Sequence, residues 1–156
     1  MLISLEIRNF LLIKNISIDF ISGFNAFTGE TGAGKSIIID GLKLALGGKN
    51  NSNLNLADGE TSNIKAVFDR DTNINQNLKY LDIQIEDDYL IVERQINHLQ
   101  KSKIFLNGQI VSQSIVKRVL INTIEFQENY EQQELFDNKY FLNFIDKLGK
   151  IELTSI

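Results

Sequence analysis

Residues 29–36 read Gly29-Glu30-Thr31-Gly32-Ala33-Gly34-Lys35-Ser36 and match the phosphate-binding loop pattern G-x-x-x-x-G-K-[ST] at every fixed position. Glycines let such a loop turn back and expose its amides, because glycine enters positive-φ conformations without penalty. The amides of residues 32–36 would form a concave nest at the first turn of a helix, where the helix dipole also favours an anion. The stretch therefore predicts a nucleotide site, with Lys35 on the β and γ phosphates and Ser36 as a ligand for Mg²⁺.

The residues on either side of this loop have the character that the motif requires. Before it, the run from Phe24 to Thr28 predicts a short buried strand that leads into the loop. After it, apolar residues from Ile37 to Leu46 recur at helical spacing, and Gly47-Gly48 predicts the C-terminal cap of that helix. The alternative is a glycine-rich turn that contains Lys and Ser by chance. Nucleotide binding is the better interpretation, because a strand is predicted before the loop and a helix after it.

The composition limits the class of protein. A chain of 156 residues with 43% apolar content predicts one globular domain with a real core. A net charge of -4 does not indicate a polyanion partner, so any DNA contact needs a local patch or further sequence. The absence of cysteine excludes disulfides, thiolate metal sites and a cysteine nucleophile. Charged residues near the N-terminus exclude a secretory signal or a membrane span there, so we expect a cytoplasmic protein without a membrane partner.

The rest of the chain reads as a mixture of strands and helices. Apolar or alternating runs predict strands at residues 2–8, 11–20, 61–70, 89–95, 103–106 and 124–126. Asn107-Gly108 predicts a hairpin turn, and residues 112–120 predict a helix capped by Ser112 or Ser114. Residues 50–58 and 71–77 are expected to be polar connections, exposed in the first case, and amphipathic helices are expected from Gln132 onward.

These residues resemble the start of the RecN family of bacterial DNA repair ATPases, which are related to the SMC proteins. The resemblance lies in the residues that begin the chain and in the Glu30-Thr31 pair, which is more specific than the general motif. The matching stretches are Met1 to Phe10, Ile13, Ile16, Asp19-Phe20, Gly23 to Asn25, the phosphate loop, Leu46 to Lys49, Phe105 to Gly108 and Ile124 to Phe136. They cover nearly the whole chain, but only the N-terminal portion of a longer family member.

The resemblance implies a fold and a set of partners. The fold would be an α/β P-loop NTPase, the N-terminal lobe of an ABC/SMC-type ATPase head with an antiparallel strand layer. Residues 1–156 would form a single ATP-binding lobe without the C-terminal lobe and coiled coil of the family. The ligands would be ATP and Mg²⁺, and the partners the missing lobe or a second head, as in a homodimer. DNA would be reached through the full-length protein, which is nucleoid-associated in the family.

Binding is better supported than hydrolysis, because several parts of an ABC-type ATPase site are not found. The run from Tyr89 to Glu93 comes nearest to a Walker B strand, and we interpret it as a half-buried strand that ends at a surface Glu. There is no Leu-Ser-Gly-Gly signature, and His98 lies in a polar turn that does not suit a switch histidine. The family supplies these parts from its C-terminal lobe, so ATP hydrolysis by this chain alone stays uncertain.

The resemblance implies further contacts with the nucleotide. RecN-like chains carry a Gln that touches Mg²⁺ and the attacking water, and the alignment of residues 124–126 makes Gln127 or Asn129 its candidate here. Arg8 and Asn9 match the end of the first strand in SMC-like heads, which approaches the base and ribose. Ordinary polar loop residues are the alternative in both cases. The predicted nucleotide contacts are thus Arg8, Asn9, Gly29, Glu30, Thr31, Gly32, Ala33, Gly34, Lys35 and Ser36, with Ser36 and Gln127 or Asn129 on the metal.

Two other functions share the phosphate loop. A fragment of the ATP-binding subunit of an ABC transporter is one, although Glu30-Thr31 departs from the usual transporter pattern. A small P-loop kinase is the other, and it needs a lid whose arginines clamp phosphates. Arg94 and Arg118 are too few and too scattered to build such a lid.

Overall fold

The computed structural model describes residues 1–29, 34–50 and 54–126. The chain divides into two compact units, Met1–Ile124 and Glu125–Ile156, and the fold below is that of the first unit. Its elements follow the chain in the order β1 (Leu2–Phe10), β2 (Ile13–Asp19), α1 (Lys35–Ala45), β3 (Thr61–Asp69), α2 (Thr72–Tyr80), β4 (Tyr89–Asn97), β5 (Ser102–Leu106), β6 (Gln109–Val111) and α3 (Gln113–Val119).

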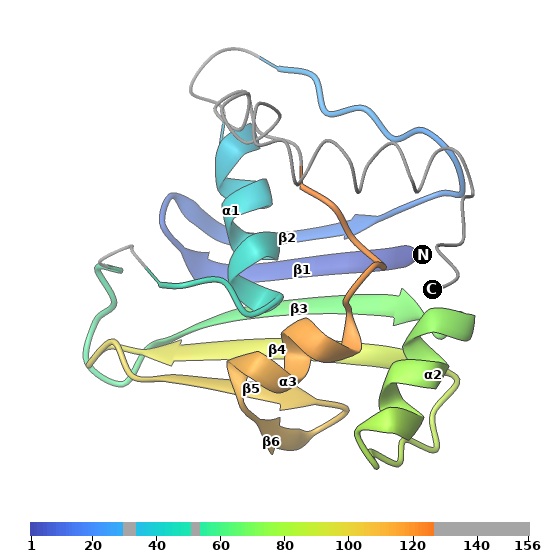
Figure 1. Cartoon of the computed structure of the whole chain (residues 1–156). Coiled ribbons are helices and arrows are strands. Elements are labelled where there is room, and N and C mark those ends of the chain that lie inside the picture. Colours follow the sequence, from blue (N-terminus) through green and yellow to red (C-terminus); the bar gives the residue numbers. More distant parts are fainter. Residues whose placement is uncertain (30–33, 51–53, 127–156) are drawn as a thin grey trace, which may run out of the picture. The chain divides into compact units, whose positions relative to one another are not determined.

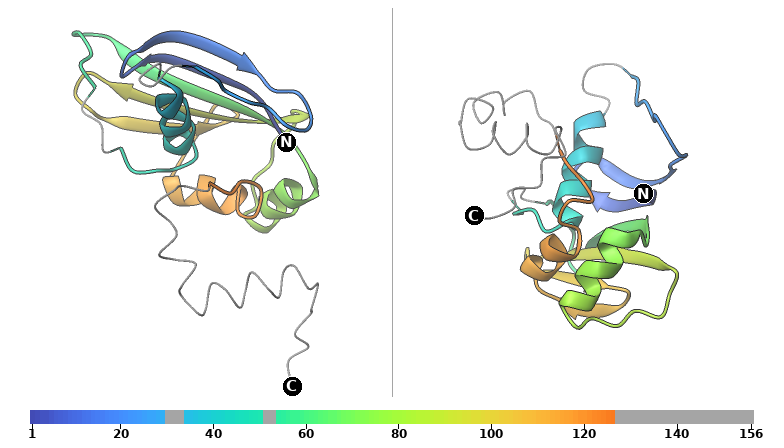
Figure 2. Two further views of the ribbon diagram at one scale, coloured as in Figure 1. Left: turned by 90° about the horizontal axis from the view of Figure 1, so that it is seen from above. Right: turned by 45° about the vertical axis from the view of Figure 1, so that its right-hand side comes forward.

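The six strands form one sheet in the order β2-β1-β3-β4-β5-β6, and every neighbouring pair is antiparallel (Figure 1). The three helices α1, α2 and α3 lie on the same face of this sheet, which is clearest when it is seen from above (Figure 2). The other face carries no helix of the first unit within the part of the chain that the structure describes. The predicted antiparallel strand layer is therefore confirmed.

Alternation along the central strands places the core under the helices. In β3 and β4 every second residue is buried, as expected for strands with one face against a core. One row of register partners across the sheet consists of Ile7, Ile64, Arg94 and Ile104. The three isoleucines in this row are buried, and full burial of each such side chain contributes about 1.5–3 kcal/mol.

A glycine allows α1 to lie close to the sheet. A Cβ atom at Gly41 would stand 2.9 Å from Cδ1 of Ile7 and 3.6 Å from Cδ1 of Phe10. Phe10 points to this face because Asn9 has a positive φ of 51°, which interrupts the alternation of β1 after Arg8. The helix that follows the phosphate loop is thus packed directly on the first strand.

The two shorter helices begin with side-chain caps. Asp71 accepts a hydrogen bond from the Ile74 amide at 2.9 Å, and Ser112 Oγ accepts one from the Ile115 amide at 3.3 Å. The cap at Ser112 was one of the two predicted for α3. The prediction of a polar connection at residues 71–77 was wrong, because the Asp71 cap and the buried pair Ile74 and Leu78 make this segment the helix α2.

The predicted strands at the N-terminus, at residues 61–70 and in the region 89–106 are confirmed, but two others are wrong. Residues 24–28 form no strand, and Phe24 is 90% exposed. The side-chain amide of Asn25 pairs with Ile21 instead, accepting from its amide at 3.1 Å and donating to its carbonyl at 2.8 Å. Residues 124–126 are also without strand structure. A strand needs a neighbouring strand to pair with its backbone groups. Neither of these two segments pairs with a strand of the described sheet.

In the connection between α1 and β3, the Gln100 side chain binds the backbone of Leu54. The expectation that residues 50–58 are exposed fails at Leu54, which is only 4% exposed. The Gln100 side chain donates to the Leu54 carbonyl at 2.8 Å and accepts from its amide at 3.4 Å. Both backbone groups of Leu54 are therefore satisfied where it is buried. In the part of the chain described by the structure, no helix has the length and apolar character needed to cross a membrane.

Candidate nucleotide site

The phosphate motif ends at the N-terminus of α1, where the helix begins at Lys35. Its N-cap is Gly34, in the left-handed conformation with φ 85° and ψ 8°. No side chain of the described residues caps this end, and the first turn contains no acidic residue. A Cβ atom at Gly34 would have no described atom within 4 Å, so no described residue covers this end of the helix, which we call the open end. An open helix N-terminus without a carboxylate is suited to an anion.

Two residues of the motif that are six positions apart meet at this end. The Lys35 ammonium donates a hydrogen bond to the carbonyl oxygen of Gly29. This contact brings together the first glycine and the lysine of the motif, and Ser36 is exposed in the first turn beside them. The other predicted residues of the loop, Glu30, Thr31, Gly32 and Ala33, lie outside the described residues.

The opposite end of α1 is closed by its own backbone. The Gly48 amide donates to the Lys43 carbonyl at 2.9 Å, and the Gly47 amide donates to the Leu44 carbonyl at 3.3 Å. These two bonds, with Gly47 at φ +89°, form a Schellman motif, which satisfies carbonyls that a helix end leaves unpaired. The predicted C-terminal cap at Gly47-Gly48 is confirmed.

A buried arginine contacts the same end of α1. Arg94 of β4 is only 1% exposed, and its Nη1 donates to the carbonyls of Leu44 at 2.9 Å and Gly48 at 2.8 Å. Its Nε donates to Ser102 Oγ on β5 at 2.7 Å. Burial lowers the pKa of Arg94 from its ordinary value. The sequence argument missed this residue, although it occupies an inward position between Val92 and Ile96 where an apolar side chain is expected.

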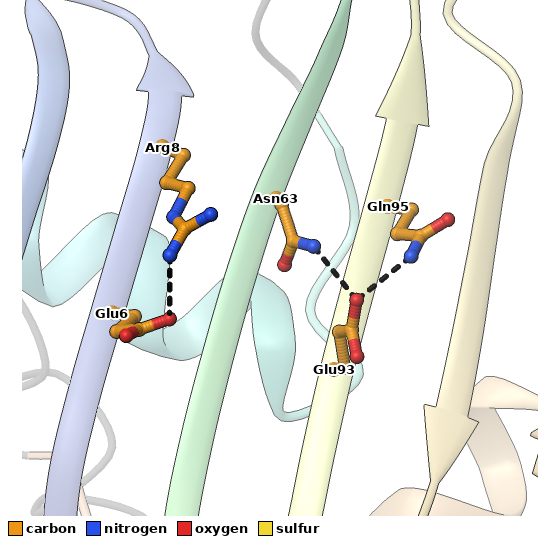
Figure 3. Close-up of polar contacts among 5 residues, drawn as sticks. All are labelled: Glu6, Arg8, Asn63, Glu93 and Gln95. Atoms are coloured by element: carbon orange, nitrogen blue, oxygen red, sulfur yellow. Dashed lines mark hydrogen bonds and ion pairs between the residues drawn. The ribbon is translucent and has the colours of Figure 1, made fainter. Parts of the chain in front are cut away.

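The strand-end residues Arg8 and Asn9 are placed away from α1. The Arg8 side chain lies on the sheet face opposite α1, where Nη2 is 3.5 Å from Oε2 of Glu6 (Figure 3). Asn9 Nδ2 donates to the Thr61 carbonyl at 3.4 Å. In this structure the Arg8 side chain contacts Glu6 of its own strand and Asn9 contacts β3, and their contact with a base or ribose stays a prediction. The candidates Gln127 and Asn129 lie outside the described residues.

Glu93, at the end of the run that comes nearest to Walker B, also lies on the face opposite α1. Its Oε1 accepts from Asn63 Nδ2 and from Gln95 Nε2, both at 2.7 Å (Figure 3). The half-buried strand is confirmed, but the prediction that it ends at a surface Glu was wrong, because β4 continues to Asn97 and Glu93 lies partly buried in its middle. His98 lies in the β4–β5 turn, where its Nδ1 accepts from the Gly59 amide at 3.3 Å.

Comparison with known proteins identifies the family of this chain. The family model described as "AAA domain" matches residues 4–153. A "DNA repair protein RecN" from Halalkalibacterium halodurans is 30% identical over 158 residues, which cover 100% of this chain and 28% of the relative. RecN from Synechocystis is 33% identical over 153 residues, which cover 96% of this chain and 26% of the relative. The predicted resemblance to the N-terminal part of RecN is confirmed.

Solved structures show the same fold. A structure from work on the ATP-driven dimerization and DNA-stimulated activation of SMC ATPases has a TM-score of 0.66 at 20% identity, covering 94% of this chain and 98% of that chain. The SMC head domain from Thermotoga maritima has a TM-score of 0.55 at 22% identity, covering 74% of this chain and 40% of that chain. The predicted fold, a P-loop NTPase lobe of the ABC/SMC type, is therefore confirmed.

The chain spans about a quarter of the length of the RecN relatives reported above, since it covers 28% and 26% of them.

Proposed function

Because this chain belongs to the AAA domain family, we propose that it is the ATP-binding N-terminal lobe of the ATPase head of a RecN-like DNA repair protein. Membership of the family implies nucleotide binding. The choice of ATP with Mg²⁺, the action on DNA and the association with the nucleoid are the finer parts of the proposal. They are supported by the identity of 30% with a RecN protein along the whole chain.

The observation that carries the proposal is the open N-terminal end of α1 within a complete phosphate-loop sequence. Gly34 turns the chain at positive φ, which directs the following amides toward one point. Lys35 is held beside Gly29 and would move its ammonium from that carbonyl to the β and γ phosphates. Ser36 would hold Mg²⁺ through its hydroxyl, and the metal would supply positive charge that offsets the charge of the phosphates. Residues 30–33 would supply further amides.

Hydrolysis in this proposal depends on residues beyond this lobe. Proton transfer from an attacking water requires a base within hydrogen-bond reach of the phosphate end. Glu93 lies on the opposite face of the sheet, where two amide side chains occupy one of its carboxylate oxygens. The lobe therefore binds and orients the nucleotide. The C-terminal lobe of the longer relatives, or a second head, completes the site.

The partner surface on this lobe is the segment before the phosphate loop together with the exposed side of α1. Ile21, Phe24 and Ile39 are large apolar side chains that are exposed there. Residues 24–28 have strand-like composition without strand structure, so a neighbouring strand would satisfy both their backbone and their side chains. We assign the strand that would pair with residues 24–28 to the remaining three quarters of a RecN-like protein. Residues 1–156 are assigned to a single lobe.

The experiment that tests nucleotide binding is a titration of the full chain with a fluorescent ATP analogue, with and without Mg²⁺. Lys35→Ala removes the ammonium beside the phosphates and should weaken binding by at least about tenfold. Lys14→Ala removes one exposed lysine of β2 and serves as the matched control, with unchanged affinity expected. Equal binding by the wild type and Lys35→Ala, with both folded, would overturn the proposed site.

The other two functions have less support. The relatives reported above are RecN proteins and the similar structures are SMC ATPases, which favours the repair ATPase over a transporter subunit. A kinase lid would need mobile arginines near the phosphates. Arg94 is buried beneath the far end of α1, and Arg118 lies 5.7 Å over the ring of Tyr80.

A further inference from the structure

The position of Arg94 in the sheet is unusual for a cation. Its register partners are Ile64 on β3 and Ile104 on β5, and it lies between the buried Val92 and Ile96 along its own strand. A side chain in this row faces the core beneath α1. Burial of a guanidinium there carries a desolvation penalty of several kcal/mol, which an apolar residue of similar volume would avoid. The location therefore requires an explanation other than packing.

The charge of Arg94 is compensated by the end of a helix. In the part of the chain that the structure describes, no carboxylate forms an ion pair with Arg94. Its partners are carbonyl oxygens of Leu44 and Gly48, which flank the C-terminal cap of α1, and the hydroxyl of Ser102. The C-terminal end of a helix carries a partial negative charge, so a cation at this point is favourable. The lowered pKa of Arg94, caused by burial, still leaves a guanidinium charged under ordinary conditions.

These contacts fix α1 in two respects. Nη1 reaches one carbonyl within the last turn of the helix and one just beyond the cap, so the helix can neither rotate nor slide along its axis without losing a bond. Nε is held by Ser102 on the neighbouring strand, which fixes the guanidinium itself. A planar fork with several donors makes such a restraint directional, and a lysine would not reproduce it.

We propose that Arg94 is a positioning residue for the nucleotide site: by anchoring the closed C-terminal end of α1 to the sheet, it sets the place of the phosphate-binding N-terminal end of the same helix. The helix has 11 residues, so the two ends are about 16 Å apart. A packed helix moves as a rigid body, and a displacement of about 1 Å at a binding end is enough to reduce its function. This inference rests on the proposed nucleotide function for its ligand, although the anchoring itself can be measured without ligand.

The test compares Arg94→Met with a matched destabilised variant. Methionine keeps an apolar stem of similar length without the charge or the donors. It leaves the Leu44 and Gly48 carbonyls without the Arg94 donor, so the variant should lose some stability, and a control for that loss is needed. Ile74→Ala removes buried side-chain volume from α2, a different helix, and serves as the control for general destabilisation. Each variant of the full chain is measured for its unfolding free energy, for amide hydrogen exchange along α1 and for affinity toward Mg·ATP.

We expect Arg94→Met to raise exchange at the hydrogen-bonded amides of α1, from Ile38 onward, and to weaken Mg·ATP binding by about tenfold, while Ile74→Ala changes neither in the folded state. Arg94→Lys, which keeps the cation but not the fork, should give an intermediate affinity. If Arg94→Met leaves exchange along α1 and nucleotide affinity at the levels of Ile74→Ala, the positioning role is wrong. If the wild type binds no better than Lys35→Ala, the nucleotide proposal is wrong, and the exchange data still decide whether Arg94 anchors the helix.

Discussion

The two ends of α1 differ in how their backbone groups are capped and in what packs against them. At the C-terminal end a Schellman motif, the buried Arg94 and the start of α3 surround Gly47 and Gly48. At the N-terminal end, no described atom lies within 4 Å of a Cβ at Gly34, and no described side chain caps the first turn. A helix that is fixed at its C-terminal end can present the amides of its first turn to a ligand without losing its position. The proposed functional end is the one that no described side chain caps, and the closed end of the same helix supports it.

The largest effect on stability is expected at the closed end, from Gly48→Ala. The added Cβ would stand 2.7 Å from the Lys43 carbonyl oxygen, a backbone atom that cannot move independently of the helix. We expect the free energy of unfolding to fall by about 3 kcal/mol in urea denaturation. Gly41→Ala on the same helix is the control. Its close contact is the end of the flexible Ile7 side chain, and the gain in helix propensity offsets the crowding. Equal losses in the two variants would contradict the account.

The open end should respond to Gly34→Ala mainly through ligand binding. Gly34 has φ +85°, so alanine there costs about 1–2 kcal/mol in backbone strain although space is available. Gly59→Ala is a matched control, since Gly59 has φ +84° and equally open surroundings among the described residues. Both variants should lose similar stability, and only Gly34→Ala should lose affinity for Mg·ATP. Unaltered affinity in Gly34→Ala would argue against a role of this turn in phosphate binding.

The start of α3 provides a helix end whose role is structural. Ser112→Ala removes the acceptor for the Ile115 amide and should lower stability by about 1 kcal/mol. Ser114→Ala leaves that bond in place and should cost less. Thermal unfolding measures both, and neither variant should change nucleotide affinity. A loss of nucleotide affinity in Ser112→Ala would contradict the expectation that a capped helix end contributes to stability alone.

The smallest effect is expected from Arg8→Ala, on the sheet face that carries no helix among the described residues of the first unit (Figure 2). The Arg8–Glu6 pair is 3.5 Å apart, and its side chains are 59% and 39% exposed. Exposed pairs of this kind contribute about 0–1 kcal/mol, so the unfolding free energy should change by less than about 1 kcal/mol. Glu6→Ala should behave in the same way. A loss of more than about 2 kcal/mol would mean that Arg8 makes contacts beyond those of this structure.

Much of the fold followed from the sequence where local chemistry decides it. Alternation in β1, β3 and β4, the Asn107-Gly108 turn, the Ser112 cap and the Gly47-Gly48 end of α1 are all set by neighbouring residues. In the candidate nucleotide site, the phosphate-loop motif predicted that α1 begins near Lys35. The structure adds the contact between Lys35 and Gly29. These features need few distant partners, so residue patterns were sufficient.

The errors fall where the outcome depends on partners far along the chain. Residues 24–28 have the composition of a strand, but the described sheet gives them no neighbour, and Asn25 bonds to Ile21 instead. The polar composition of residues 72–80 hid α2, whose apolar face is only Ile74 and Leu78. Arg94 was read as an isolated arginine, because its carbonyl partner on Leu44 lies 50 residues away in sequence.

The central claim is that the amides at the open end of α1 bind phosphate, and amide NMR of the full chain titrated with Mg·ATP tests it most directly. The account predicts large shift changes for the amides of Gly34, Lys35 and Ser36, with little change at Leu46, Gly47 and Gly48 at the closed end. Saturable shifts confined to other regions, with residues 34–36 unmoved, would contradict it.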